Sequence, residues 1–259
     1  MSNRSRAVWN DIYLAIVAFF AGIVSASVGG GGLLLIPALF NAYPGTAAVT
    51  ILGTNRLVFG VGGLGNVWRV LRKTPPDWSL VWPGILFGAP LAALGASLLL
   101  VISESWYKPV LLVIMILLAI YTFRHKQLGQ EKTEPLVHGK AVPAASAGWG
   151  GLIGIYLGLI GPAAQSFTIL AFVRLFGLDF KRASHHAQIL INALNLATLI
   201  WFGWYGYFLW ETGILMGICS IAGTVVGARF VSKGGNTLVR RLFMLLLIIE
   251  TGRFAWQLF

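Results

Sequence analysis

One arginine stands in the middle of an apolar stretch and is the first candidate for chemistry. Arg56 lies about ten residues into the segment 47–70, which is long enough to cross a bilayer. A charge near the bilayer centre costs roughly 2.5–3.5 kcal/mol on insertion scales, and such residues usually have a function. Gly60 and Gly63 share its helical face, so we expect open space beside the guanidinium. An anionic ligand would suit this charge; the alternative is that Arg56 caps carbonyls of a neighbouring broken helix.

A row of polar side chains is the second feature. Four residues of segment 183–204 are separated by three, four and three positions, which places them on one helical face: His185, Gln188, Asn192 and Asn195. Such a stripe inside a membrane faces a pore or, alternatively, a partner helix. Four residues in register favour a lined path. His185 or His186 could carry a coupling proton, because histidine titrates near neutral pH, although either could be an ordinary interfacial histidine.

Two breaks interrupt long apolar segments. Residues 29–32 read GGGG inside segment 11–43, and "GLIGPAAQSF" at 158–167 interrupts segment 141–176. Backbone left without hydrogen bonds at membrane depth is tolerated only where it is buried in protein or lines a cavity. The helix that follows each break would direct its positive N-terminus at an anion, although glycines can also serve helix packing. The candidate binding residues around the breaks are Gly30, Gly31, Gln165, Ser166 and, beside Arg56, Asn55.

The composition indicates a membrane protein. The chain has 259 residues, of which 57% are hydrophobic and only 10% charged, whereas soluble domains carry about 25% charged residues. The net charge of +11 comes from basic residues in loops between apolar runs, as in cytoplasmic loops, and we expect no nucleic-acid partner. A single cysteine excludes an intramolecular disulfide and a cysteine-based metal cluster. No cofactor or metal is expected.

Eight apolar segments in two similar halves give the expected fold class. We expect an all-α polytopic membrane protein with about eight transmembrane segments in two four-segment repeats. Residues 1–123 form the first repeat, 124–140 a cytoplasmic linker and 141–259 the second repeat. The segments are 11–43, 47–70, 78–101 and 106–123 in the first repeat, and 141–176, 183–204, 211–232 and 237–258 in the second.

Loop charges indicate that the repeats are inverted. The loops at 70–78, 124–140 and 174–182 are basic and are therefore expected inside, whereas 203–211 contains neither lysine nor arginine. Segment 141–176 must then enter and leave on the same face, as a re-entrant segment or hairpin broken at its glycines. If segment 11–43 does the same, the second repeat is upside down relative to the first. Inverted repeats with a midplane site are a recurrent plan of secondary transporters.

Three motifs resemble the sulfite exporter TauE/SafE family of bacterial membrane permeases. They are GGGG at 29–32, "LLLIPAL" at 33–39 and "AAVTILGTNR" at 47–56. The second copy is degenerate, with "GLIGPAAQSF" and "RASHHAQ" at the corresponding places. The resemblance covers nearly the whole chain. It implies transport of a small sulfur anion across the bacterial cytoplasmic (inner) membrane, with the two breaks and the spans after them forming the site.

We therefore expect a secondary transporter that works by alternating access on sulfite, sulfoacetate or another short sulfonate. The alternatives are an anion channel and a permease for a non-sulfur organic anion. A membrane enzyme is disfavoured because HExxH, a Cys–His pair and a mid-membrane carboxylate pair are missing from the sequence, as is the ATP-binding GxxxxGK[ST]. The expected partners are a small anionic substrate, membrane lipid and a coupling proton or other ion.

Overall fold

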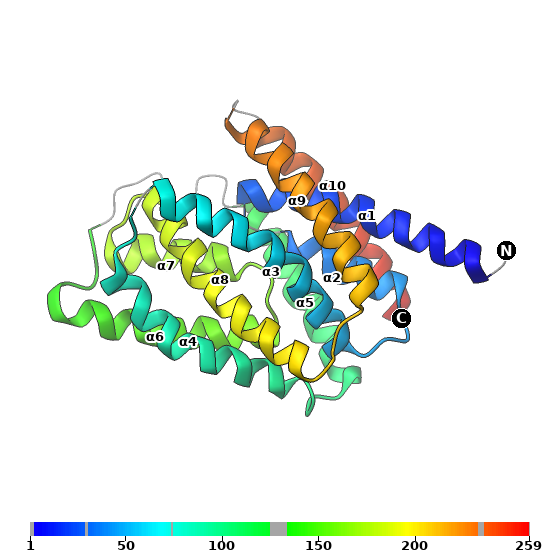
Figure 1. Ribbon diagram of the computed structural model, residues 1–259, viewed down its shortest axis with the longest axis horizontal. Coiled ribbons are helices and arrows are strands. Elements are labelled where there is room, and N and C mark those ends of the chain that lie inside the picture. Colours follow the sequence, from blue (N-terminus) through cyan, green and yellow to red (C-terminus); the bar gives the residue numbers. More distant parts are fainter. Residues whose placement is uncertain (1–2, 29–30, 74, 125–133, 233–235, 259) are drawn as a thin grey trace.

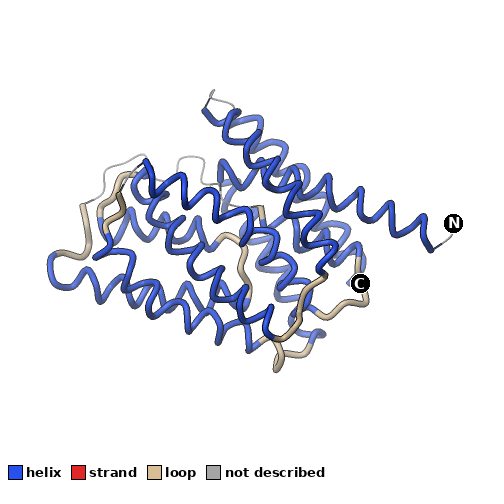
Figure 2. The backbone as a smooth tube through the Cα atoms, in the orientation of Figure 1, coloured by secondary structure: helices blue, strands red, loops and turns tan. Residues whose placement is uncertain are grey.

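The computed structural model describes residues 3–28, 31–73, 75–124, 134–232 and 236–258. Within these ranges the chain forms ten α-helices and one short 3₁₀ helix, and it contains no β-strand (Figures 1 and 2). The N-terminal half contains α1 (Asn3–Val28), α2 (Gly32–Ala42), α3 (Ala48–Lys73), α4 (Trp78–Leu98) and α5 (Glu104–Arg124). The C-terminal half contains η1 (Gly139–Ala141), α6 (Val142–Leu159), α7 (Ala164–Phe176), α8 (Phe180–Trp204), α9 (Trp210–Ser232) and α10 (Asn236–Leu258).

Five of the described helices are long and apolar enough to cross a membrane. These stretches are 8–25 in α1, all of α4, 139–159 around α6, all of α8, and 210–227 in α9. Large apolar side chains such as Trp82, Leu86 and Phe87 of α4 are exposed on the outer surface, where lipid would cover them. The all-helical membrane class predicted from the sequence is thus confirmed. The predicted eight crossings in inverted repeats are more than these five helices account for.

Both broken segments fold back on themselves as helical hairpins. In the first, Asn10 near the start of α1 donates from Nδ2 to the carbonyl of Ala42 at the end of α2, at 3.2 Å. In the second, the backbone N–H of Val137, just before α6, donates to the carbonyl of Leu175 near the end of α7, at 3.0 Å. Each segment therefore begins and ends at the same end of the molecule.

The second break has a backbone conformation that ends one helix and begins the next. The N–H groups of Ile160 and Gly161 both donate to the carbonyl of Tyr156, at 2.8 and 3.1 Å, and α6 ends there. Gly161 has φ +93° and Ala163 has φ 61°, so the chain passes twice through the left-handed region around Pro162. A positive φ is uncommon for alanine and marks local strain.

Glycine contacts join helices from different halves. A Cβ on Gly88 of α4 would lie 2.6 Å from the carbonyl oxygen of Gly150 in α6, and one on Gly227 of α9 would lie 2.6 Å from that of Ile23 in α1. Only small residues let membrane helices approach so closely. The first helix of each half thus packs along the fourth helix of the other half: α1 on α9, and α6 on α4 (Figure 1).

Helices α3 and α8 cross in an antiparallel direction between these two pairs. Gly60 of α3 faces Leu199 of α8, whereas Gly63, further along α3, faces Asn192, which is earlier in α8. Two hydrophobic clusters flank this crossing. One is built mainly from α1, α2, α3, α5 and α10, and the other from α4, α6, α7 and α8. The polar residues of α3 and α8 therefore meet near the middle of the molecule.

Candidate functional site

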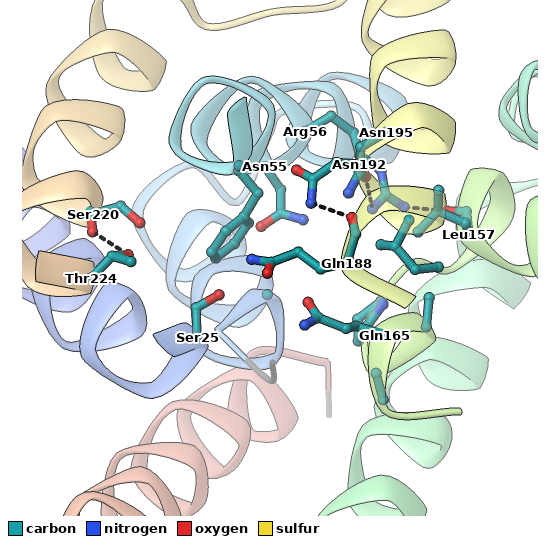
Figure 3. Close-up of a pocket in the computed structure, with 18 residues that line it drawn as sticks. Ser25, Asn55, Arg56, Leu157, Gln165, Gln188, Asn192, Asn195, Ser220 and Thr224 are labelled. Atoms are coloured by element: carbon teal, nitrogen blue, oxygen red, sulfur yellow. Dashed lines mark hydrogen bonds between the residues drawn. The ribbon is translucent and has the colours of Figure 1, made fainter. Parts of the chain in front are cut away.

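A cavity of about 80 Å³ lies where the two helix breaks approach the crossing of α3 and α8 (Figure 3). A water molecule needs roughly 10–15 Å³ of such space, so the cavity can hold a few waters or a small ion. Both halves of the chain contribute to its wall. The lining residues are Ser25, Gly32, Asn55, Arg56, Phe59, Gly63, Leu157, Gly161, Pro162, Ala163, Ala164, Gln165, Gln188, Ile191, Asn192, Asn195, Ser220 and Thr224.

Arg56 caps the broken end of α6. Its side chain is only 4% exposed, and Nη2 donates a hydrogen bond to the carbonyl of Leu157 (Figure 3). That carbonyl is one of the last four of α6, which have no partner inside the helix. Nη1 donates to Oδ1 of Asn195 at 3.2 Å. The alternative considered from the sequence, an arginine that caps a neighbouring broken helix, therefore describes a real part of its role.

Capping leaves part of the guanidinium unused. A guanidinium has five N–H donors, and Nε of Arg56 has no hydrogen-bond partner among the described residues. Among the described residues that line the cavity, Arg56 is also the one charged side chain. The C-terminal dipole of α6 offsets only about half a charge. The cavity is consequently positive, with a donor left over.

Glycine makes room for this arginine at the second helix break. A Cβ on Gly161 would overlap the guanidinium of Arg56. The space beside Gly63 is occupied by the side-chain amide of Asn192, and the space beside Gly60 by Leu199. The prediction of open space beside the guanidinium was therefore wrong at Gly60, where Leu199 fills it, whereas Gly63 does line the cavity together with Arg56.

Amide side chains form most of the remaining polar wall. Three of the four stripe residues of α8, Gln188, Asn192 and Asn195, line the cavity as one row, and Nδ2 of Asn192 donates to the carbonyl of Gln188 at 2.7 Å. Asn55 of α3 is only 2% exposed, and its Oδ1 has no hydrogen-bond partner within the described parts of the chain. Gln165 extends toward the same space from α7 (Figure 3).

Two helix N-termini border the cavity. Gly32 is the first residue of α2, Ala164 is the first of α7, and both belong to the lining. The N-terminal turn of a helix carries about half a positive charge and several unpaired N–H groups. Together with Arg56, these ends make the cavity suited to an anion that has several acceptor oxygens.

Several candidate residues lie outside the cavity wall. Gly30 falls outside the described residues. Gly31 is buried, with its Cβ position 2.5 Å from the carbonyl oxygen of Ala21 and 2.9 Å from the Phe59 ring, so it serves the packing of the first break. Ser166 of α7 is half-buried but does not line the cavity.

The two histidines also lie away from the cavity. Nε2 of His186 accepts the backbone N–H of Asp77 at 3.0 Å, and Nδ1 lies 2.6 Å from the carbonyl of Arg182. His186 therefore joins the start of α8 to the start of α4, with the proton on Nδ1. His185 is its neighbour at the same end of α8 and does not line the cavity either. A coupling proton on either residue stays a prediction, without support from their placement.

Sequence reasoning missed the contribution of α9. Ser220 and Thr224 line the cavity one helical turn apart, and Oγ1 of Thr224 donates to the carbonyls of Ser220 at 2.9 Å and Gly22 at 3.3 Å. Phe59 and the Leu157 carbonyl were also missed. The one available signal was the four-residue spacing of two hydroxyl side chains.

Comparisons with known proteins place the chain among membrane transporters. The family model described as "Sulfite exporter TauE/SafE" matches residues 14–253. "Probable membrane transporter protein YfcA" of Escherichia coli strain K12 is 30% identical over 244 residues, which cover 94% of this chain and 89% of the relative. "Probable membrane transporter protein" of Haemophilus influenzae is 30% identical over 248 residues, with 94% of each chain covered. No solved structure matches this chain.

Proposed function

This chain belongs to the sulfite exporter TauE/SafE family, and from that membership we propose a secondary transporter for a small sulfur-containing oxyanion. Family membership confirms the resemblance predicted from the sequence and identifies the chain as a multi-pass membrane transporter. The proposed substrate is sulfite, sulfoacetate or another short sulfonate. The proposed location is the bacterial cytoplasmic (inner) membrane.

One observation carries the proposed substrate class. Among the described lining residues Arg56 is the one charged side chain, amides and hydroxyls form the rest of the polar wall, and Nε of Arg56 has no hydrogen-bond partner there. Oxygens of a sulfite or sulfonate group accept charge-assisted hydrogen bonds from guanidinium, which are about twice as strong as neutral ones. Gln165, Gln188 and Asn55 can donate from their amide nitrogens to further oxygens. The cavity of about 80 Å³ suits an anion of a few heavy atoms.

The helix arrangement supports alternating access by inverted repeats. Both halves open with a hairpin, and each first helix packs on the fourth helix of the other half. The counterparts α3 and α8 cross antiparallel, as a two-fold axis in the membrane plane would require. Movement of one half against the other would open the cavity between α3 and α8 to each side in turn.

A binding experiment on purified protein tests the anion site. We expect methanesulfonate and sulfite to bind, and the neutral isostere dimethyl sulfone not to bind, in isothermal titration calorimetry. Gln165→Glu adds a negative charge to the cavity wall. Because Gln165 is the second residue of α7, the helix N-terminus favours an acidic residue there and folding should persist. We expect at least a tenfold loss of affinity.

Gln165→Met is the matched control for that experiment. It removes the amide without adding charge, so we expect a much smaller loss than for Gln165→Glu. Wild-type affinity in Gln165→Glu would mean that anions bind elsewhere. In vesicles, saturable uptake that is accelerated by substrate on the opposite side identifies a carrier, whereas non-saturating flux would identify a channel.

Replacing the guanidinium itself gives a second test. Arg56→Lys keeps the charge but loses the planar fork that contacts Leu157 and Asn195 and leaves Nε available. We expect affinity for methanesulfonate to fall by about 1–3 kcal/mol, the scale of an unpaired polar group, and Arg56→Gln to weaken binding further. If Arg56→Gln is well folded and binds methanesulfonate with unchanged affinity, the role of Arg56 is only to cap the end of α6.

A further inference from the structure

A buried carboxylate lies outside the cavity, in α10. Glu250 is 3% exposed, and its Oε2 accepts hydrogen bonds from the Tyr13 hydroxyl of α1 and from Nδ2 of Asn41 in α2, the latter at 3.0 Å. Asn41 also donates to the backbone carbonyl of Glu250 at 3.4 Å. Glu250 thus holds both helices of the first hairpin through one carboxylate oxygen.

The surroundings of Glu250 are mainly cationic. Arg253, one turn further along α10, lies 5.0 Å from the centre of the Tyr13 ring. Lys108 of α5 lies 5.5 Å from the centre of the ring of Phe40, the residue before Asn41. On α1, Asp11 is half-buried two positions before Tyr13. Among the described residues, the titratable groups of this region thus include the phenol of Tyr13, the carboxylate of Asp11 and the cations Arg253 and Lys108, and the buried phenol of Tyr107 lies beside Lys108 on α5.

A proton fits this site better than a metal ion. Helix α9, which also contacts α10, carries its described charges, Glu211 and Arg229, in its first and last turns, and both are exposed. The described residues contain no group of three or more His, Cys, Asp or Glu that could hold a metal. A second cation beside Arg253 would be repelled, whereas a proton simply converts the Glu250 carboxylate to a neutral acid. Ionisable residues inside membrane segments commonly form proton relays.

Helix α2 connects Glu250 to the cavity. Its first residue, Gly32, lines the cavity, and Asn41 near its other end contacts Glu250. The helix has 11 residues, which corresponds to roughly 16 Å, and Leu33 to Phe40 are all buried. Closely packed interiors have low compressibility and transmit strain, so a displacement at one end of α2 can reach the other end, across Pro37 inside the helix.

We propose that Glu250 is the binding site of a coupling proton, linked to the anion cavity through α2; this rests on the proposed transport function. Protonation makes the carboxyl a weaker acceptor for Tyr13 and Asn41, because charged acceptors form the stronger hydrogen bonds. The hold of α10 on the α1–α2 hairpin then loosens. A ligand shifts a conformational equilibrium only by its different affinity for the two states, and these two hydrogen bonds supply that difference.

The first measurement detects the proton without transport. Acid-minus-neutral infrared difference spectra of the purified protein show the C=O stretch of carboxyl groups that become protonated. We expect Glu250→Gln to lose the component that comes from a carboxyl shielded from water, whereas the control Glu211→Gln, which replaces an exposed carboxylate in the first turn of α9, should lose only a component from a hydrated carboxyl. Identical carboxyl bands in wild type and Glu250→Gln would overturn the proton site.

The second measurement detects coupling. In vesicles, an inward proton gradient should drive wild-type methanesulfonate accumulation at least fivefold above the no-gradient level. Glu250→Gln should keep affinity within about twofold and substrate exchange across the membrane, but lose the accumulation driven by the gradient. Glu211→Gln should accumulate methanesulfonate as wild type does. Two results would overturn the coupling. One is gradient-driven accumulation that persists in Glu250→Gln, and the other is a Glu250→Gln variant that loses substrate exchange as well as accumulation.

Tyr13→Phe keeps the proposal testable if Glu250→Gln fails to fold. It removes one hydrogen bond to Oε2 and keeps the ring under Arg253. We expect the pH midpoint of the Glu250 band to move from its wild-type value, together with the pH dependence of uptake. An unchanged midpoint would overturn the proposal. Wild-type protein that shows the band but takes up no sulfur oxyanion would overturn the transport function and its coupling, and would leave a protonation site at Glu250.

Discussion

At the scale of single residues, Arg56 shows how one side chain can serve both folding and binding. It holds the end of α6 through the Leu157 carbonyl, and it contributes the positive charge of the cavity wall. Truncating it would leave a helix end unpaired as well as an empty anion site, so its removal alone is a poor test of function. A change that displaces the guanidinium without deleting it is more informative.

Gly161→Ala is such a change. Its Cβ would overlap the Arg56 guanidinium, and the φ of +93° at this position strains any side chain. We expect stability to fall by about 1–3 kcal/mol and methanesulfonate affinity to fall at least tenfold. Thermal unfolding and calorimetry measure the two effects. Gly148→Ala in α6, where a Cβ meets nothing within 4 Å, is the control and should leave both unchanged. Equal behaviour of the two variants would contradict the close approach of Gly161 to Arg56.

Residue-level prediction from the sequence succeeded where a helical period carried the signal. The spacing of Gln188, Asn192 and Asn195 predicted one row, and the row lines the cavity. It failed where partners come from distant parts of the chain. Glu250 was overlooked because its two side-chain partners, Tyr13 and Asn41, lie 237 and 209 positions away, and no local pattern links them.

At the scale of secondary structure, the two breaks convert long apolar segments into hairpins. The glycine run and Gly161–Pro162 predicted where the helices stop, because both sequences disfavour a continuous helix. The positive φ of Ala163 could not be predicted, since alanine rarely adopts it and the contacts of Tyr156 with the loop hold it there. The expectation that segment 141–176 enters and leaves on the same face came from loop charge, a signal that is independent of helix propensity, and it was extended to segment 11–43 by analogy.

The first break gives a prediction at this scale. Gly31→Leu would force a side chain between the Ala21 carbonyl and the Phe59 ring, and so separate α2 from α1 and α3. We expect uptake of methanesulfonate to be abolished and the unfolding temperature to fall. Gly45→Leu, at a loop position with open space around the Cβ, should keep the wild-type uptake and the wild-type unfolding temperature. Normal uptake by Gly31→Leu would show that the packing of this break is unimportant for transport.

At the scale of the whole molecule, the orientation in the membrane can be measured directly. His138 lies before α6 and Tyr205 directly after α8, and both are exposed. In a Cys219→Ser background, we expect a membrane-impermeant thiol reagent to label His138→Cys only from the cytoplasmic side and Tyr205→Cys only from outside. Labelling of both positions from the same side would contradict the inverted arrangement.

The sequence predicts a duplication, but it does not predict which helices of the two halves pack on each other. Small residues recur in α4 and α9 and are typical of close helix packing in membranes, but glycine does not identify the helix that packs against it. The pairing of α4 with α6 and of α1 with α9 is a property of the assembled chain. It also decides which hydroxyl side chains of α9 reach the cavity.

Because helices of one half pack on helices of the other half, the order of synthesis decides when each helix meets its partner. When α1 leaves the ribosome, the helix that will cover its glycine face, α9, begins at residue 210 and has not yet been made. Helix α4 likewise waits for α6, which begins at residue 142. During that interval the bare backbone of both helices must be shielded by lipid or by the insertion machinery. A nascent chain that stops before residue 210 would therefore leave the glycine face of α1 uncovered. We expect membrane quality control to recognise such a chain as incompletely folded.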